Sequence, residues 1–324
     1  NFIKILVKDL DDKNPADKNK FTPLHLAARY GHLDIVQFLV PQLENKFPKS
    51  GSMKNEWAWN EWHGMTPLHE AAVNGHLKVI EYLLPFVDDD INPPQGDGFT
   101  VMSIAAYFGH LDVVTYYTEK LDYINPKNMS GDKFNGRTPL HEAAQNGHLI
   151  IVQHICNLLL DKNPSDDDGY TPLHLAVEYE HLEIVKYFVQ FLDNPDLLYM
   201  ISEKYNKKQP NGRTPLHEAC QYGHMSTVHH ICNLLQDKNP ADENQFTPLH
   251  LAARYGHLNI VQFLVPQLKN KFPKSGSMHY DYEGTIIEWH GMTPLHEAAV
   301  NGHLKVIEYL LTFVDDDINP PEGQ

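Results

Sequence analysis

The sequence predicts an all-α repeat solenoid, a stack of helix–turn–helix repeats with projecting β-hairpin loops. Three observations predict it. The tetrapeptide TPLH occurs seven times in 324 residues, and a degenerate form, TVMS, begins at Thr100. Each occurrence precedes small residues and a Gly-His pair or its variant, and then a segment with apolar residues at helical spacing. Successive motifs begin 33 to 46 residues apart, a spacing typical of repeat architectures.

The first complete repeat shows how each element follows from its residues. Thr22 caps a helix N-terminus with its hydroxyl, and Pro23 takes the first helical position, where a missing N–H leaves no hydrogen bond unmade. Gly31 ends this helix in a left-handed turn. The second helix then presents apolar residues at helical spacing, namely Leu33, Val36, Leu39 and Val40. One helix pair cannot bury its own apolar face, so the fold requires stacked neighbours.

This repeat resembles the ankyrin repeat, which has a 33-residue period and a T-P-L-H signature. The resemblance covers nearly the whole chain and implies a single solenoid over residues 1–324. Residues 1–20 are interpreted as half a repeat, because "NFIKILVKDLDDKNP" is similar to the second-helix segment "VQHICNLLLDKNP". Eight repeats follow.

Two repeats depart from the pattern. The third has Val101 and Ser103 in place of the Pro and His, which predicts a less pre-organised helix start. The fifth has Glu180 where the other repeats carry the turn glycine, so a side chain must adopt a positive φ at a cost of about 1 kcal/mol. Ordinary sequence drift and a local weak point both account for such departures.

Composition argues against several functions. The formal net charge of −16 repels the phosphates of nucleic acid and an anionic membrane surface, and no apolar run is long enough to span a bilayer. The cysteines Cys156, Cys220 and Cys232 have neither metal-ligand nor disulfide-framework spacing. We expect small buried thiols, which fit a reducing, cytoplasmic location if the protein is natural.

The 21 histidines do not predict a metal site. Fifteen belong to the TPLH motif or to the Gly-His turn and its Glu-His variant, and we expect these to tie turn to turn through backbone hydrogen bonds. The others lack zinc-type spacing. Acidic runs at 88–90, 166–168 and 315–317 do not follow the ligand spacing of a calcium loop, so we interpret them as solvated turn charge. No nucleophile, phosphate or dinucleotide motif occurs, so we predict no catalytic site and no cofactor.

Odd and even repeats differ, so the repeating module is a pair of about 76 residues. Before the motif, odd repeats carry Phe21, Phe99, Tyr170 and Phe246, and even repeats carry Met65, Arg137, Arg213 and Met292. After it, odd repeats carry Leu26, Ile104, Leu175 and Leu251, and even repeats carry Glu70, Glu142, Glu218 and Glu297. Odd repeats are also followed by extra residues. In the ankyrin resemblance these form long β-hairpin fingers near residues 45–63, 124–136, 193–212 and 270–290.

Two of these fingers stand in a framework that is nearly identical in sequence. Residues 21–53 match 246–278 and residues 61–97 match 288–324, with five differences in seventy positions. The segments between them, residues 54–60 and 279–287, differ in both sequence and length and are called the rewritten loops below. Drift would scatter changes over the whole surface. A rewritten loop on a repeated framework therefore indicates that the loop residues were selected for a purpose.

Two sets of residues are candidates for binding a protein partner. The finger set is Trp57, Trp59, Trp62, Tyr280, Tyr282, Ile286, Ile287 and Trp289. Tryptophan and tyrosine anchor interfaces at low entropic cost, although for Trp62 and Trp289, which occur in both frameworks, we favour a structural role at the hairpin base. The first-helix set is Tyr30, Tyr107, Phe108, Tyr179, Tyr222 and Tyr255, with Arg29 and Arg254 beside them. In the ankyrin resemblance this line faces a concave partner-binding groove, and packing between repeats accounts for it equally well.

We therefore expect a non-enzymatic protein-binding scaffold whose fingers make the contacts. The repeated framework favours an engineered antibody mimetic over a natural gene with a recent internal duplication. One alternative is a natural intracellular adaptor or effector that binds its partner through the groove, and another is a purely structural or elastic array. Apolar residues near the two ends, such as Ile3 and Leu310, predict end-to-end self-association or further residues outside this segment, because solenoids usually need polar caps.

Overall fold

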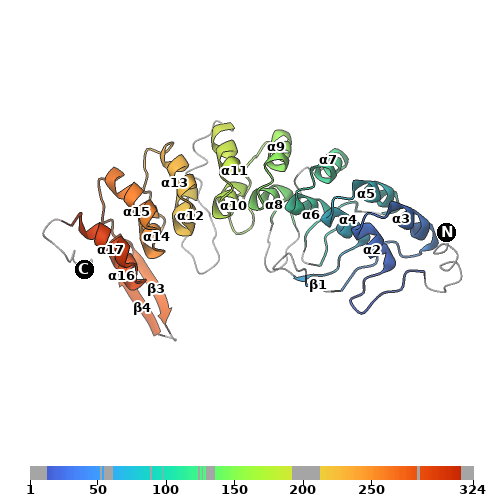
Figure 1. The fold of residues 1–324 in the computed structure, drawn as a ribbon, viewed down its shortest axis with the longest axis horizontal. Coiled ribbons are helices and arrows are strands. Elements are labelled where there is room, and N and C mark those ends of the chain that lie inside the picture. Colours follow the sequence, from blue (N-terminus) through green and yellow to red (C-terminus); the bar gives the residue numbers. More distant parts are fainter. Residues whose placement is uncertain are drawn as a thin grey trace. The chain divides into compact units, whose positions relative to one another are not determined.

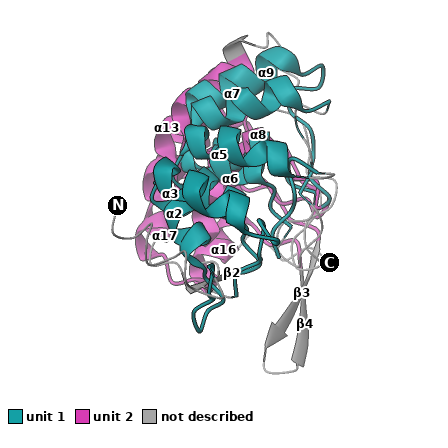
Figure 2. Ribbon diagram, turned by 90° about the vertical axis from the view of Figure 1, so that its right-hand side faces the viewer, with its two compact units in different colours: residues 1–167 teal, residues 168–324 magenta. Residues whose placement is uncertain are grey.

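The computed structural model describes residues 13–51, 53–54, 61–87, 90–96, 98–122, 125, 127–128, 136–191, 212–282 and 285–314. Its contacts divide the chain into an N-terminal unit, residues 1–167, and a C-terminal unit, residues 168–324 (Figure 2). Within each unit, pairs of short helices follow one another in chain order (Figure 1). Each unit is therefore a helical repeat array, and the two are described separately.

The first helix of each pair starts directly after the motif threonine. These first helices are α2 (Pro23–Arg29), α4 (Pro67–Val73), α6 (Val101–Phe108) and α8 (Pro139–Gln145) in the N-terminal unit, and α10 (Pro172–Glu178), α12 (Pro215–Tyr222), α14 (Pro248–Arg254) and α16 (Pro294–Val300) in the C-terminal unit. Consecutive first helices pack against each other within each unit, as expected for stacked repeats.

The second helix of each pair packs against the first helix of its own repeat. These second helices are α3 (Leu33–Leu39), α5 (Leu77–Leu83), α7 (Leu111–Lys120), α9 (Leu149–Leu158), α11 (Leu182–Lys186), α13 (Met225–Cys232), α15 (Leu258–Leu264) and α17 (Leu304–Leu311). Short 3₁₀ turns η2 (Val40–Gln42), η3 (Leu84–Phe86) and η6 (Val265–Gln267) and the π-helical η4 (Tyr187–Phe191) extend four of them. The predicted helix pairs are confirmed.

In repeats one, two, six and seven, the motif histidine joins the first helix to the segment that leads into the next repeat. The backbone N–H of Thr22 donates to Nδ1 of His25 at 3.2 Å, so the ring proton lies on Nε2, which donates to the carbonyl of Met65 at 2.9 Å. The same bond runs from His69 to Pro93, from His217 to Phe246 and from His250 to Met292. These bonds confirm the predicted role of the motif histidines and require their neutral form.

The third repeat replaces this histidine with a different polar network. Thr100 caps α6 by accepting from the backbone N–H of Ser103 at 3.2 Å. The Ser103 hydroxyl donates to Oδ1 of Asn128 at 2.6 Å, and Asn128 is buried. Its amide also lies 3.5 Å from Oε1 of Glu142. Helix α6 begins at the usual position, and Asn128 provides the connection to the following repeat, while the less pre-organised helix start stays a prediction.

Replacing Asn128 with Ala is expected to lower the free energy of unfolding by about 2 kcal/mol, because it leaves buried groups of Ser103 and Glu142 without that partner. Urea unfolding measures the change. Lys127→Ala is the matched control, since Lys127 forms an exposed ion pair with Asp167 and should change stability by less than about 0.5 kcal/mol. Equal midpoints for both variants would contradict the role of Asn128.

The fifth repeat holds a side chain in the left-handed region, as predicted. Glu180 has φ +60°, whereas the corresponding Gly223 has φ +83° and Gly256 has φ +76°. We expect Glu180→Gly to stabilise the chain by about 0.5–1 kcal/mol, because glycine adopts this conformation without steric strain. Thermal unfolding of the variant checks this. A lower Tm than that of the unchanged chain would show that contacts of the Glu180 side chain stabilise the fold by more than the backbone strain destabilises it.

Asparagine side chains of Asn-Pro dipeptides accept hydrogen bonds from the N-terminal turns of the first helices. Their Oδ1 atoms accept from the backbone N–H at the second helical position: Asn14 from Leu24, Asn92 from Met102, Asn125 from Leu140 and Asn239 from Leu249, at 2.9–3.1 Å. This satisfies an N–H that has no partner inside the helix.

The cysteines Cys156, Cys220 and Cys232 are buried as predicted.

Two antiparallel strand pairs occur among the described residues. Strand β1 (Met53–Lys54) pairs with β2 (Glu61–Trp62), and β3 (Ser277–Tyr282) pairs with β4 (Thr285–His290). Met53 lies opposite Trp62, and the equivalent Met278 lies opposite Trp289. The two rewritten loops thus start from the same backbone register. The expected turn at Glu283 and Gly284 lies outside the described residues, as does most of the fingers expected near 124–136 and 193–212.

Candidate functional site

The C-terminal ends of the first helices carry exposed tyrosines. The exposed fractions are 65% for Tyr30, 48% for Tyr179, 38% for Tyr222 and 47% for Tyr255. Tyr107 and Phe108 are half-buried and pack edge-to-face, with ring centroids 5.0 Å apart. Most of the predicted first-helix set is therefore accessible to a partner, whereas Tyr107 and Phe108 are less exposed and pack on each other within α6.

The turn histidines fix these tyrosines in place in the C-terminal unit. Tyr222 stacks on His224 with centroids 6.0 Å apart, and Nε2 of His224 donates to the carbonyl of Glu178 at 2.8 Å. Tyr255 stacks on His257 in the same way, and His257 donates to the carbonyl of Gln221 at 2.9 Å. His224 thereby connects Tyr222 to Glu178, the residue before Tyr179. In the same way, His257 connects Tyr255 to Gln221, the residue before Tyr222.

A glycine makes this close approach of consecutive turns feasible. A Cβ atom on Gly223 would lie 2.6 Å from Cε1 of His257, closer than any van der Waals contact allows. In the step from Tyr222 to Tyr255, the imidazole ring of His257 therefore lies directly against the backbone of the Gly223 turn.

Arg29 and Arg254, which the sequence places beside the tyrosines, have a structural role. Nε of Arg29 lies 2.7 Å from Oε2 of Glu70, and Nε of Arg254 lies 2.8 Å from Oε2 of Glu297. Both glutamates are buried, and both belong to the next, even repeat. Each guanidinium also covers the phenylalanine before its own motif, Phe21 or Phe246. The odd–even alternation thus encodes a buried ion pair across a repeat boundary.

The other two even repeats supply the arginine themselves. Arg213 lies 3.9 Å from both Glu218 and Asp242, and all three are buried. Arg137 lies 3.5 Å from Asp166, which is also buried. The interpretation of residues 166–168 as solvated turn charge is therefore wrong for Asp166, because its carboxylate balances a guanidinium inside the array.

Burial changes the protonation of these glutamates. It raises the pKa of Glu142 to about 7, against the opposing effect of Arg137. It raises the pKa of Glu218 to about 7 as well, against the opposing effect of Arg213. The pKa of Glu70 is also raised by burial, and Arg29 counteracts this. These groups are buried acids in the first helices of the even repeats.

Comparison with known families decides what this array is. A family model described as ankyrin repeats (3 copies) matches residues 1–50, 50–128, 103–197 and 189–275, and a single ankyrin repeat model matches residues 290–320. The chain belongs to the ankyrin repeat family. Ankyrin repeat proteins are generally non-enzymatic scaffolds that mediate protein–protein interactions, so the chain is a protein-binding scaffold. No curated protein matches the chain in sequence.

The structure describes only some of the finger residues of this ankyrin array. Trp57 and Trp59 lie outside the described residues. Trp62, Tyr280, Tyr282, Ile286, Ile287 and Trp289 lie on the paired strands β2, β3 and β4. The register pairs Tyr280 with Ile287, Met278 with Trp289 and Asp281 with Ile286.

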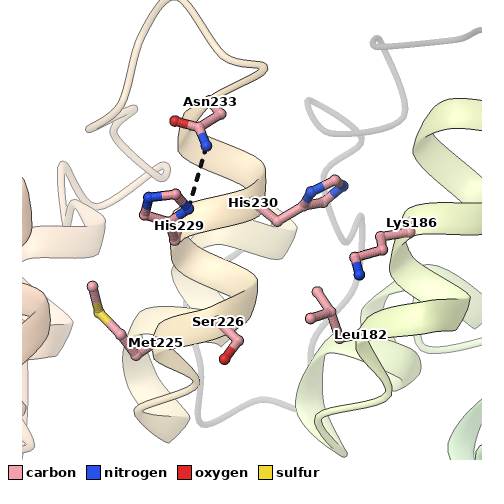
Figure 3. A pocket seen from close by; sticks show the side chains of 7 residues that line it. All are labelled: Leu182, Lys186, Met225, Ser226, His229, His230 and Asn233. Carbon is pink, nitrogen blue, oxygen red and sulfur yellow. Dashed lines mark hydrogen bonds between the residues drawn. The ribbon is translucent and has the colours of Figure 1, made fainter.

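A shallow groove of about 460 Å³ lies between the second helices α11 and α13 (Figure 3). Its lining residues are Leu182, Lys186, Met225, Ser226, His229, His230 and Asn233. Lys186 forms an ion pair with Glu183, and His229 hydrogen-bonds Asn233 and packs on Phe263. Lys186 and His229 thus already make contacts within the repeats, whereas the buried Nε2 of His230 has no hydrogen-bond partner among the described residues.

Among the described residues, no cluster of three or more His, Cys, Asp or Glu side chains could hold a metal ion. No helix in the same part of the chain is both long enough and apolar enough to cross a membrane.

Proposed function

We propose that this ankyrin array binds a protein partner mainly through its long loops, and that the rewritten loops determine which partner it binds. The observation that carries the proposal is the shared register of the two framework copies. Met53 pairs with Trp62 and Met278 pairs with Trp289, yet the rewritten segment between the framework copies is seven residues long in the first, 54–60, and nine residues long in the second, 279–287. A loop that varies in sequence and length on an unchanged base has the organisation of a recognition loop.

The composition of these loops supports the proposal. The rewritten loops contain Trp57, Trp59, Tyr280 and Tyr282, which are residue types that dominate the energetics of protein interfaces. A repeated framework with altered loops is what an engineered antibody mimetic would have, and we favour that origin. The proposal for the loops also holds for a natural gene that duplicated recently.

A second candidate surface is favoured by the exposed tyrosines at the first-helix ends. Tyr179, Tyr222 and Tyr255 are all more than a third exposed, although apolar and aromatic surface is normally buried. In this alternative the chain is an adaptor that docks its partner along the first helices, and the loops add little.

A capture experiment tests the loop proposal. The full chain is compared as bait with a variant whose residues 54–60 and 279–287 are replaced by Gly and Ser. The matched control is Asp34→Asn, because the second framework copy already has Asn259 at that position. We expect partners that the full chain and the control capture and the loop variant loses. Equal capture by all three would contradict the loop proposal and favour the first-helix surface.

A further inference from the structure

Three consecutive repeats of the C-terminal unit present a tyrosine at the same position, eight residues after the motif threonine. These residues, Tyr179, Tyr222 and Tyr255, are called the tyrosine ladder below. The other even repeats carry asparagine at this position: Asn74, Asn146 and Asn301. Tyr222 is therefore the one substitution among the even repeats that makes the aromatic row continuous, and all three of its members are exposed.

The ladder has a regular spacing. Helix α10 packs on α12 and α12 packs on α14, and the axes of packed helices lie about 8–10 Å apart. Equivalent bonds, from His224 to Glu178 and from His257 to Gln221, span the two steps, with Glu180 at the turn of the first and Gly223 at the turn of the second. A polyproline II helix rises about 3.1 Å per residue with three residues per turn, so its every third residue recurs after about 9 Å. The spacing expected from helix packing therefore matches the polyproline period over three tyrosines.

The ladder is also pre-organised for binding. The rings of Tyr222 and Tyr255 stack on the histidines that follow them, with interplanar angles of 18° and 19°. The hydroxyl of Tyr222 donates to Oε1 of Glu178 at 3.2 Å. Little side-chain entropy remains to be lost when a partner docks on such rings. Aromatic-lined surfaces of this kind are what proline-rich segments recognise, because the polyproline II conformation is itself pre-formed.

Charge at one end of the ladder specifies the partner further. Glu180 follows Tyr179 directly, its side chain is 56% exposed, and it occupies the strained left-handed position that other repeats give to glycine. Strain of this kind persists where the residue has a use. Its carboxylate lies 3.4 Å from Nδ1 of His224, and the carboxylate of Glu178 lies beside Tyr222. This end of the ladder therefore suits a cationic residue.

We propose that the tyrosine ladder docks a proline-rich segment of a partner protein in the polyproline II conformation. Its prolines are three residues apart, one on each of Tyr179, Tyr222 and Tyr255, and an Arg or Lys beside the first of them faces Glu180. The inference rests on the proposed function, that the chain binds proteins, and it names the chemistry that the first-helix surface recognises.

Fluorescence anisotropy with the full chain tests the proposal. The probe is a labelled peptide of the form Arg-Pro-Ser-Gln-Pro-Ser-Gln-Pro, and its comparison has the same composition with the three prolines adjacent. We expect the spaced peptide to bind at least tenfold more tightly. Tyr222→Asn, which restores the residue of the other even repeats, should weaken its binding at least tenfold. Tyr30→Asn, in the N-terminal unit, should leave the affinity within twofold.

The contribution of Glu180 has its own readout. Glu180→Gln should weaken binding of the spaced peptide about threefold at low ionic strength, and the difference should disappear at high salt. Equal binding of the two peptides, or unchanged binding by Tyr222→Asn, would overturn the proposal. Absence of peptide binding by a chain that still captures protein partners would overturn the docking inference and leave the proposed function standing. If neither the peptide assay nor the capture assay shows binding, both the docking inference and the proposed function are wrong.

Discussion

Replacing Arg213 with Met is expected to lower the free energy of unfolding by about 3–5 kcal/mol, because it leaves two buried carboxylates, those of Glu218 and Asp242, without their cation. Burial raises the pKa of Glu218 to about 7, and loss of Arg213 would raise that pKa further. A group whose pKa is raised in the folded state stabilises it more at low pH. The loss should therefore be larger at pH 8 than at pH 5. Urea unfolding at the two pH values measures it.

Two other repeats show how the stability lost in Arg213→Met can be recovered. Met already precedes the motif in repeats two and eight, where the buried glutamate receives its arginine from the preceding repeat, as Glu70 does from Arg29. Glu178 occupies the position of that arginine in repeat five. We expect Glu178→Arg combined with Arg213→Met to recover at least half of the lost stability. A double variant no more stable than Arg213→Met alone would show that the two arrangements are not interchangeable.

Acidification is expected to lower the free energy of unfolding gradually from pH 6.5 and more steeply below about pH 4.5. Burial lowers the pKa of His69 and His250 to about 4 and that of His217 to about 3. Each contributes stability that is present above pH 6.5 and is lost as the pH falls toward the folded value, at about 1.4 kcal/mol per pH unit. Glu142 and Glu218, with pKa values of about 7, work in the opposite direction between pH 7 and 4.5. The two glutamates offset two of the three histidines, so a net loss of about 1.4 kcal/mol per pH unit remains until the glutamates are protonated in both states.

A variant separates the two contributions. In the Glu142→Gln, Glu218→Gln variant no glutamate titration opposes that of the histidines, so its stability should decline more steeply than that of the unchanged chain from pH 6.5 downward. Chemical unfolding in a series of buffers from pH 8 to pH 3 measures both profiles. A profile that stays flat to pH 3, or one that the glutamine variant leaves unchanged, would contradict the assignment of neutral buried histidines.

The helices were predictable from the sequence because their signals are local. The Thr-Pro start, the histidine three residues after the threonine and the turn glycine lie within ten residues of one another, and the structure places α2 at Pro23–Arg29 accordingly. The positive φ of Glu180 also follows from its place in the repeat. Such features depend on one repeat alone.

Interactions between repeats could not be predicted in the same way. The alternation of Leu26 and Glu70 is visible in the sequence, but the partner of Glu70 is Arg29, which lies 41 residues earlier. Asn128 replaces the absent histidine of repeat three from a position 25 residues beyond Ser103. Charge patterns alone made Asp166 look solvated, because nothing local indicates that Arg137 meets it inside the array. Each of these pairings becomes visible only when neighbouring repeats are stacked.

The measurement that tests the account most directly is hydrogen exchange on the chain with and without a captured protein partner. The account predicts that protection increases in peptides covering the rewritten loops, 54–60 and 279–287, and at the ends of the first helices α10, α12 and α14. Protection confined to the second helices, such as α11, α13 and α15, would contradict it, because the partner would then bind a surface to which this account assigns no role.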